Sequence, residues 1–160
     1  MADQPVSRRA LFAALVSGAG IVAAACSSRA TTELEGPEGR ILQWEGDDLL
    51  ILVSGFQASY HLGETLHVNV LVNNQSTNTA EVRVRTKILG RGDQPVVQAE
   101  PVVLEAKPEE APNVDQALPL GRDLVPGDYT LSVEVPPWKV QGRDVGSGAM
   151  LKAAIRIEGG

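Results

Sequence analysis

The feature that most constrains this chain is a two-residue alternation of branched aliphatic and polar side chains between residues 40 and 160. Successive side chains of a β-strand point to opposite faces, so a strand that is buried on one face produces this period. The alternation is clearest in four segments, residues 65–73, 82–88, 129–135 and 151–158. Apolar residues at the three- and four-residue spacing of an amphipathic helix are not evident in this region. The sequence therefore predicts an all-β domain.

Turn-forming residues divide the alternating region into about seven short strands. Residues 73–78 are rich in Asn and Ser, and residues 90–93 contain two glycines. This number of strands predicts two antiparallel sheets packed face to face over residues 40–160. Aromatic residues make up only 4% of the chain, so we expect a core of Val, Leu and Ile that also includes Trp44. Residues 105–113 are polar and contain two prolines, which predicts a flexible loop.

One local motif is more specific than the alternation. The sequence Leu124-x-Pro126-Gly127-x-Tyr129 resembles the tyrosine corner of immunoglobulin-like and fibronectin-type modules. Together with Leu62-Gly63-Glu64-Thr65 and Asn73-Asn74 at the two ends of one predicted strand, it makes residues 45–158 resemble a bacterial immunoglobulin-like lipoprotein domain. The resemblance implies an immunoglobulin-like antiparallel β-sandwich of about seven strands, in which the Tyr129 hydroxyl hydrogen-bonds back to the turn. Such folds carry many functions, so the resemblance assigns none.

Residues 1–25 have the three parts of a secretory signal peptide. A charged start with Arg8 and Arg9 precedes a short apolar run, residues 10–25, which ends in small side chains. A membrane-spanning helix needs about 20 apolar residues, more than this run supplies. The segment Ser7-Arg8-Arg9-Ala10-Leu11-Phe12 also resembles the twin-arginine export motif, which would imply that the domain folds before export. An ordinary positively charged start of a signal peptide is the alternative.

The segment Val22-Ala23-Ala24-Ala25-Cys26 resembles a bacterial lipobox, in which Cys26 begins the mature chain and receives lipid. Cleavage by the general signal peptidase is the alternative, and it would leave the single cysteine of the chain as a free thiol. Ser27 and Ser28 after the cysteine favour an outer-membrane destination by analogy with known sorting rules. Residues 26–39 are expected to be the lipidated cysteine and a flexible linker. We therefore expect a lipid-anchored cell-envelope protein, on the periplasmic side or at the cell surface.

Charge and motif content exclude several classes of function. The chain has 14 Lys and Arg against 20 Asp and Glu, a formal net charge of −6. Nucleic-acid binding requires a positive surplus, so nucleic acid is not an expected partner. The sequence contains no motif of a nucleophilic serine, a zinc peptidase, a redox dithiol or a phosphate-binding loop. We expect no enzyme activity, no catalytic residue, no cofactor and no metal.

Two features of the predicted surface are candidates for binding a partner. Arg83, Arg85 and Lys87 form an outward cationic row on one predicted strand, suited to an acidic partner or to lipid headgroups. Trp138 follows two prolines in a predicted loop, and tryptophan is enriched at binding hot spots. The alternatives are a solvated strand face for the cations and a cap on the end of the sandwich for Trp138.

These features predict a non-catalytic binding or scaffolding subunit of a membrane-associated assembly, with a protein partner in the envelope. The alternative function is a periplasmic metal- or small-ligand-binding carrier, in which His61, His67 and Met150 would bind copper or zinc. Two exposed histidines and a methionine at the edge of the core are the simpler interpretation of those three residues.

Overall fold

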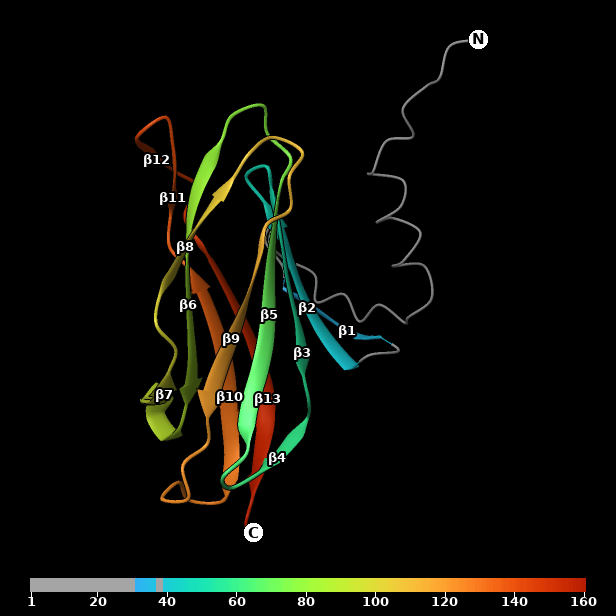
Figure 1. Ribbon diagram of the computed structural model, residues 1–160, viewed down its shortest axis with the longest axis vertical. Coiled ribbons are helices and arrows are strands. Elements are labelled where there is room, and N and C mark those ends of the chain that lie inside the picture. The colour runs from blue at the N-terminus through green and yellow to red at the C-terminus, as the bar shows by residue number, and fades with distance from the viewer. Residues whose placement is uncertain (1–30, 37–38) are drawn as a thin grey trace.

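The alternating segments form strands (Figure 1), and in the longer strands the buried residues mostly alternate with more exposed ones. The computed structural model describes residues 31–36 and 39–160, and in this part of the chain thirteen strands form two sheets. The five-stranded sheet contains, in spatial order, β1 (Thr32–Gly36), β2 (Gly39–Gly46), β3 (Leu49–Phe56), β5 (Thr65–Asn74) and β9 (Asn113–Pro119). The eight-stranded sheet contains β12 (Arg143–Val145), β11 (Trp138–Val140), β6 (Ala80–Leu89), β10 (Gly127–Val135), β13 (Ala149–Glu158) and β4 (Ser59–His61), with β7 (Pro95–Gln98) and β8 (Val102–Ala106) paired to β6.

The prediction of an all-β sandwich of antiparallel sheets is confirmed, but the number of strands is larger than the seven expected. Seven strands have seven or more residues, namely β2, β3, β5, β6, β9, β10 and β13. The other six have only three to five residues and extend the edges and ends of the sheets. Such short strands lack enough residues to show a clear alternation, which is why the sequence pattern did not separate them.

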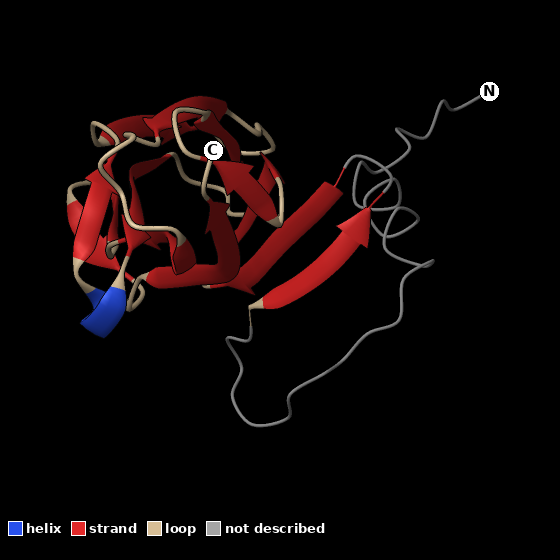
Figure 2. Ribbon diagram, turned by 90° about the horizontal axis from the view of Figure 1, so that it is seen from below, coloured by secondary structure: helices blue, strands red, loops and turns tan. Residues whose placement is uncertain are grey.

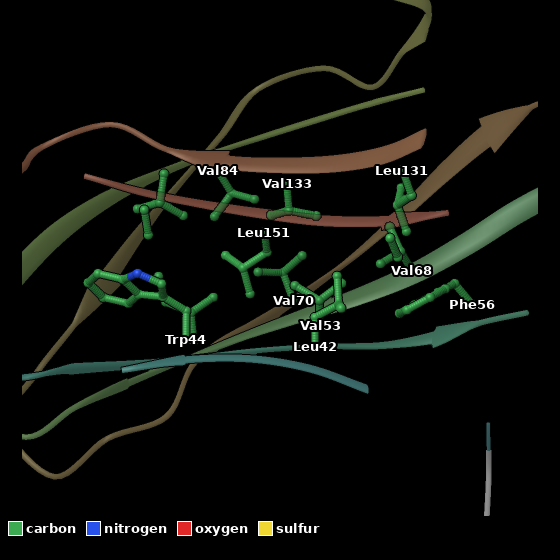
Figure 3. Packing of buried hydrophobic residues seen from close by; sticks show 14 of the residues in the cluster. Leu42, Trp44, Val53, Phe56, Val68, Val70, Val84, Leu131, Val133 and Leu151 are labelled. Carbon is green, nitrogen blue, oxygen red and sulfur yellow. The ribbon is translucent and has the colours of Figure 1, made fainter. Parts of the chain in front are cut away.

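A layer of aliphatic side chains fills the space between the two sheets (Figure 3). Val68 and Val70 of β5 face Leu131 and Val133 of β10, and all four side chains are buried. Each fully buried side chain of this kind contributes about 1.5–3 kcal/mol of transfer free energy. The alternation that we found in the sequence is therefore the pattern of this inner layer.

The tyrosine corner expected from the sequence is present. The Tyr129 hydroxyl donates a hydrogen bond of 2.5 Å to the backbone carbonyl of Val125, four residues earlier in the turn that leads into β10. The bond ties the turn to the first residues of a central strand. This bond explains why the Pro126-Gly127 pair leads into that strand.

Strand β1 lies within residues 26–39, which we expected to be a linker, and that prediction is wrong for residues 32–36. β1 pairs antiparallel with β2 at five positions. Glu33 also accepts a hydrogen bond from the guanidinium of Arg40 across the hairpin. Because Glu and Gly are uncommon in strands, the composition of this segment did not predict a strand. Pairing with β2 stabilises it, so the domain begins before residue 40.

The same hairpin covers a free edge of the opposite sheet. The Arg40 guanidinium donates to the backbone carbonyl of Ala154 in β13 at 2.6 Å, and the Thr31 hydroxyl donates to that of Met150 at 3.2 Å. The Arg40 guanidinium also lies 5.2 Å from the centre of the Phe56 ring, at cation–π distance. Side chains therefore satisfy backbone groups of β13 that would otherwise form an open edge.

Replacement of the corner tyrosine by phenylalanine tests the role of its hydroxyl. We expect Tyr129→Phe to lower the free energy of unfolding by about 1 kcal/mol, because one intramolecular hydrogen bond is lost while the ring remains. Urea unfolding followed by circular dichroism measures the change. Val125→Ala, at a side chain that is 74% exposed, is the control and should leave stability within about 0.5 kcal/mol of the parent. Equal stability of Tyr129→Phe and the parent would contradict the role of the corner.

Candidate functional site

A polar hollow of about 620 Å³ lies at the end of the sandwich where the β5–β6 loop, the start of the β8–β9 loop and the β11–β12 turn meet. Figure 1 shows β6, β8 and β11 coming together at this end. The hollow is lined by Thr77, Asn78, Thr79, Glu81, Glu105, Pro108, Lys139, Gln141 and Gly142. Most of these side chains are hydroxyls, amides or charged groups, which supply both hydrogen-bond donors and acceptors.

Three strands bring the charged groups of the hollow side by side. Glu81 of β6 is in register with Glu105 of β8 on one side and with Lys139 of β11 on the other. The Lys139 ammonium also lies 3.9 Å from a carboxylate oxygen of Asp144 in β12. Directly opposed residues in antiparallel strands have Cβ atoms about 5 Å apart, so the hollow holds two neighbouring carboxylates beside one ammonium group.

A buried amide fixes the loop that forms one wall of the hollow. The Asn74 side chain is fully buried, and its Nδ2 group donates to the carbonyls of Asn78 and Ala106, each at 2.7 Å. Its Oδ1 atom accepts from the backbone amide and the hydroxyl of Ser76, at 2.9 and 2.8 Å. All four hydrogen-bonding positions of the amide are therefore used within the fold.

The backbone of Asn74 joins the same loop to the neighbouring one. Its amide donates to the carbonyl of Glu110 at 3.2 Å, and its carbonyl accepts from the amide of Glu109 at 3.1 Å. Asn74 thus connects the β5–β6 loop with the β8–β9 loop, which we had expected to be flexible. Pro108 of the β8–β9 loop lines the hollow.

The tight β11–β12 turn supplies the opposite wall. Gln141 and Gly142 at this turn both have positive φ angles, 51° and 75°. A two-residue turn of this shape favours Gly because it has no Cβ to clash. The Gln141 side-chain amide donates to Oδ1 of Asn78 at 3.1 Å and so links the two walls.

The cationic row is present, but much of its charge is compensated. Arg83 is exposed on the outward face of β6, as predicted. Arg85 and Lys87 share a single carboxylate, Glu134 of β10, with N–O distances of 3.7 and 3.6 Å. Lys87 and Glu134 also line a second, smaller hollow of about 210 Å³ on this face. The row therefore does not form a surface of three unpaired cations.

The structure does not support Trp138 as a surface anchor. Its side chain is only 2% exposed, and its ring packs edge-on against that of Trp44 with centroids 6.0 Å apart. An indole buried in the core cannot present its face to a partner. Trp44 is also buried, as the sequence predicted.

The three residues of the expected metal carrier lie far apart. His61 of β4 is in register with Glu158 of β13, eight residues from Met150 on the same strand. At about 3.3 Å per residue this separation is roughly 26 Å. His67 is exposed on β5 of the other sheet. The structure therefore contradicts a shared metal site built on these three side chains.

The predictions for residues 1–25 and Cys26, including the export motif at Ser7, Arg8 and Arg9, lie outside the described residues. Within residues 31–36 and 39–160 no helix has the length and hydrophobicity needed to cross a bilayer.

Most residues of the polar hollow were not candidates in our reading of the sequence. The turn at residues 73–78 and the outward position of Asn73 were predicted, but Asn74 was assigned to the turn and its burial was missed. The available signal was the strict alternation of β5, which places Asn74 in register with the buried Val72. An asparagine side chain that points into the core needs hydrogen-bond partners within the protein. Ser76, Asn78 and Ala106 provide them.

Comparison with solved structures finds glycoside hydrolases among the similar folds. A mutant β-glucosidase from Listeria innocua in complex with laminaribiose has a TM-score of 0.52 at 18% identity, over 69% of this chain and 16% of that chain. The β-glucosidase in complex with isofagomine gives 0.52 at 19% identity, over 70% and 16% of the two chains. A family 123 glycoside hydrolase from Clostridium perfringens, studied for glycolipid glycan hydrolysis, gives 0.51 at 10% identity, over 70% and 27%.

This chain thus spans between about a sixth and a quarter of the length of these enzymes. At such identities the likeness establishes a shared fold. The sequence matches no protein-family model and no curated protein. Because the similar folds belong to enzymes that act on carbohydrates, the expectation of a scaffolding subunit of a membrane-associated assembly is wrong.

Truncation of the buried amide tests whether it organises the hollow. We expect Asn74→Ala to lower the free energy of unfolding by roughly 2–4 kcal/mol, because the backbone carbonyls of Asn78 and Ala106 and the amide and hydroxyl of Ser76 lose their partner. The neighbouring Asn73→Ala, on the outward face of the same strand, is the matched control and should change stability by less than about 0.5 kcal/mol. Urea unfolding of both variants provides the comparison. Similar small losses in the two variants would show that Asn74 does not organise this end of the sandwich.

Proposed function

We propose that this chain is a carbohydrate-binding accessory domain whose ligand occupies the polar hollow. The observation that supports this most strongly is the lining of the hollow, where amides, hydroxyls, carboxylates and an ammonium group surround about 620 Å³. Each sugar hydroxyl both donates and accepts hydrogen bonds, so a sugar requires such a mixture of partners. The volume falls within the range of small-molecule sites, about 300–1,000 Å³.

The rigidity of the walls also supports binding. The Asn74 side chain makes three hydrogen bonds to the β5–β6 loop and one to Ala106 at the end of β8, and Gln141 joins the two walls through Asn78. Groups that are already held in place lose little conformational entropy when a ligand binds. This matters for sugars, because each of their hydrogen bonds replaces one to water and contributes little net free energy.

The fold likeness agrees with an accessory role in carbohydrate metabolism. The similar β-sandwich in the Listeria innocua enzyme corresponds to 16% of a chain that was solved with laminaribiose, and in the Clostridium perfringens enzyme to 27% of the chain. A domain of this size next to a larger enzyme suits substrate binding or positioning. We therefore favour β-linked glucans and related glycans as first probes.

Binding without hydrolysis is the activity that we propose. Glycosidases place an acid and a base or nucleophile on either side of the scissile bond. Glu81 and Glu105 instead are exposed side chains that stand next to each other on adjacent strands of one sheet face. Two carboxylates in this arrangement can accept hydrogen bonds from the same face of a sugar.

Replacement of a wall residue tests the site. We expect the full chain to show saturable binding to immobilised glycans, with laminaribiose as a soluble competitor. Asn78→Ala should weaken binding about tenfold, since a loss of roughly 1.4 kcal/mol changes affinity by that factor. Gln98→Ala on β7, outside the hollow, is the control and should bind as the parent does. Failure of the parent chain to bind any glycan, or release of reducing sugar, would contradict the proposal.

We also propose that the domain is held at the cell envelope by a lipid on Cys26 after removal of residues 1–25, with Ser7, Arg8 and Arg9 directing export and the outer membrane as the favoured destination. The support is the lipobox-like and twin-arginine-like sequence described above. Two or more acyl chains are sufficient for stable anchoring. Anchoring would keep a glycan-binding domain close to the surface where extracytoplasmic polysaccharides are handled.

Intact-mass analysis of the protein purified from solubilised membranes tests the anchor. We expect a chain that begins at Cys26 and carries the mass of its acyl groups. Cys26→Ser should abolish this modification and release the protein from the membrane fraction. A full-length or soluble protein with an unmodified cysteine would contradict the anchor without affecting glycan binding.

A further inference from the structure

In the described part of the chain, the first element after the proposed lipid site is β1, which forms a hairpin with β2. Figure 2 shows this hairpin projecting from one side of the sandwich, away from the body formed by the other strands. The chain enters it at Thr31 and Thr32, and the Thr31 hydroxyl is bonded to the edge of β13. The start of the domain is therefore fixed at this side of the molecule.

Only five residues, 27–31, separate Cys26 from β1. Fully extended, they reach about 20 Å, since each residue spans at most roughly 3.6 Å. A lipid on Cys26 would therefore keep the start of β1 within about 20 Å of the headgroups. The domain would rest against the bilayer and would not move on a long linker.

The outward face beside the hairpin has a stripe of apolar side chains. Leu34 of β1, Ile41 of β2, Leu52 of β3 and Leu71 of β5 lie on four neighbouring strands, and strand register places them on the face away from the core. All four are half-buried, and none belongs to the core cluster. An apolar stripe on the outer side of a sheet favours contact with an apolar or interfacial surface.

The charge on this face suits an uncharged surface. Glu33 and Glu35 alternate with Leu34, so they point to the other side of β1, where Glu33 is paired with Arg40. Among the outward positions of the five-stranded sheet, the carboxylates are Glu45 at the end of β2 and Asp115 of β9, and Asp115 accepts a hydrogen bond of 2.7 Å from the side-chain amide of Asn69. The partner is therefore better matched by zwitterionic headgroups than by a strongly charged layer.

From these observations we propose that the outward face of the five-stranded sheet, together with the β1–β2 hairpin, is the membrane-contacting side of the domain. This inference rests on the lipid anchor of the proposed function. It gives the hollow an orientation, because Glu81, Glu105 and Lys139 lie on the other sheet, on the side of the sandwich opposite β1 (Figure 1). The glycan site would thus face away from the bilayer that holds the domain.

Quenching of an added tryptophan by brominated lipid tests the orientation. The full chain is expressed in a bacterial host, purified with its lipid and reconstituted in phosphatidylcholine vesicles that contain brominated acyl chains. Ile41→Trp reports on the proposed contact face, and Val103→Trp, at a 50% exposed position on the eight-stranded sheet, is the matched control. The native Trp44 and Trp138 are buried and supply a constant background that the parent chain measures.

We expect quenching of Ile41→Trp to exceed that of the parent at least about twofold, and Val103→Trp to match the parent, because acyl-chain bromine quenches only nearby rings. Leu34→Trp is the second variant if Ile41→Trp fails to fold. Quenching of Val103→Trp as strong as that of Ile41→Trp would overturn the orientation, and so would parent-level quenching in both. The intact mass of each sample separates the causes: an unmodified Cys26 overturns the anchor and this inference together, whereas an acylated Cys26 without quenching overturns this inference alone.

Discussion

The candidate site depends on one buried amide. Asn74 occupies an inward position of β5. The remaining inward positions of this strand are occupied by aliphatic core residues, namely Leu66, Val68, Val70 and Val72. A polar group at that position is tolerated because all of its donors and acceptors are satisfied, by Ser76 and Asn78 of the β5–β6 loop and by Ala106 at the end of β8. The same hydrogen bonds that allow the amide to be buried therefore give the β5–β6 loop a fixed shape. The backbone of Asn74 also holds the β8–β9 loop, through Glu109 and Glu110.

The aliphatic layer between the sheets supplies the scaffold on which that loop geometry rests. Seven longer strands carry this layer, and short strands at the edges complete the sheets. Backbone groups at the edge of β13 are satisfied by Arg40 and Thr31, and the start of β10 by the tyrosine corner. The edge of β13 is thus protected, and the polar loops at the end of the sandwich can form a site without being needed for the core.

How far the sequence predicts this structure depends on whether a feature is local and periodic. The inward positions of β5, β6, β10 and β13 followed from alternation alone, and the Tyr129 hydrogen bond followed from a six-residue motif. The strand at residues 32–36 and the burial of Trp138 depend on partners distant in the chain, so composition and local sequence misassigned them. The hollow was missed for the same reason, since Glu81, Glu105 and Lys139 meet only through strand register. The pairing of Arg85 and Lys87 with Glu134 likewise appears only when β6 and β10 are placed side by side.

The central claim is that a carbohydrate occupies the polar hollow at the end of the sandwich. The most direct measurement is a two-dimensional nitrogen–proton NMR titration of the isotopically labelled full chain with laminaribiose and longer β-glucans. The account predicts shifts of backbone amides concentrated at residues 77–81 and 139–142, which surround the hollow. Shifts confined to the outward face of the five-stranded sheet, or no saturable shift with any glycan, would contradict it.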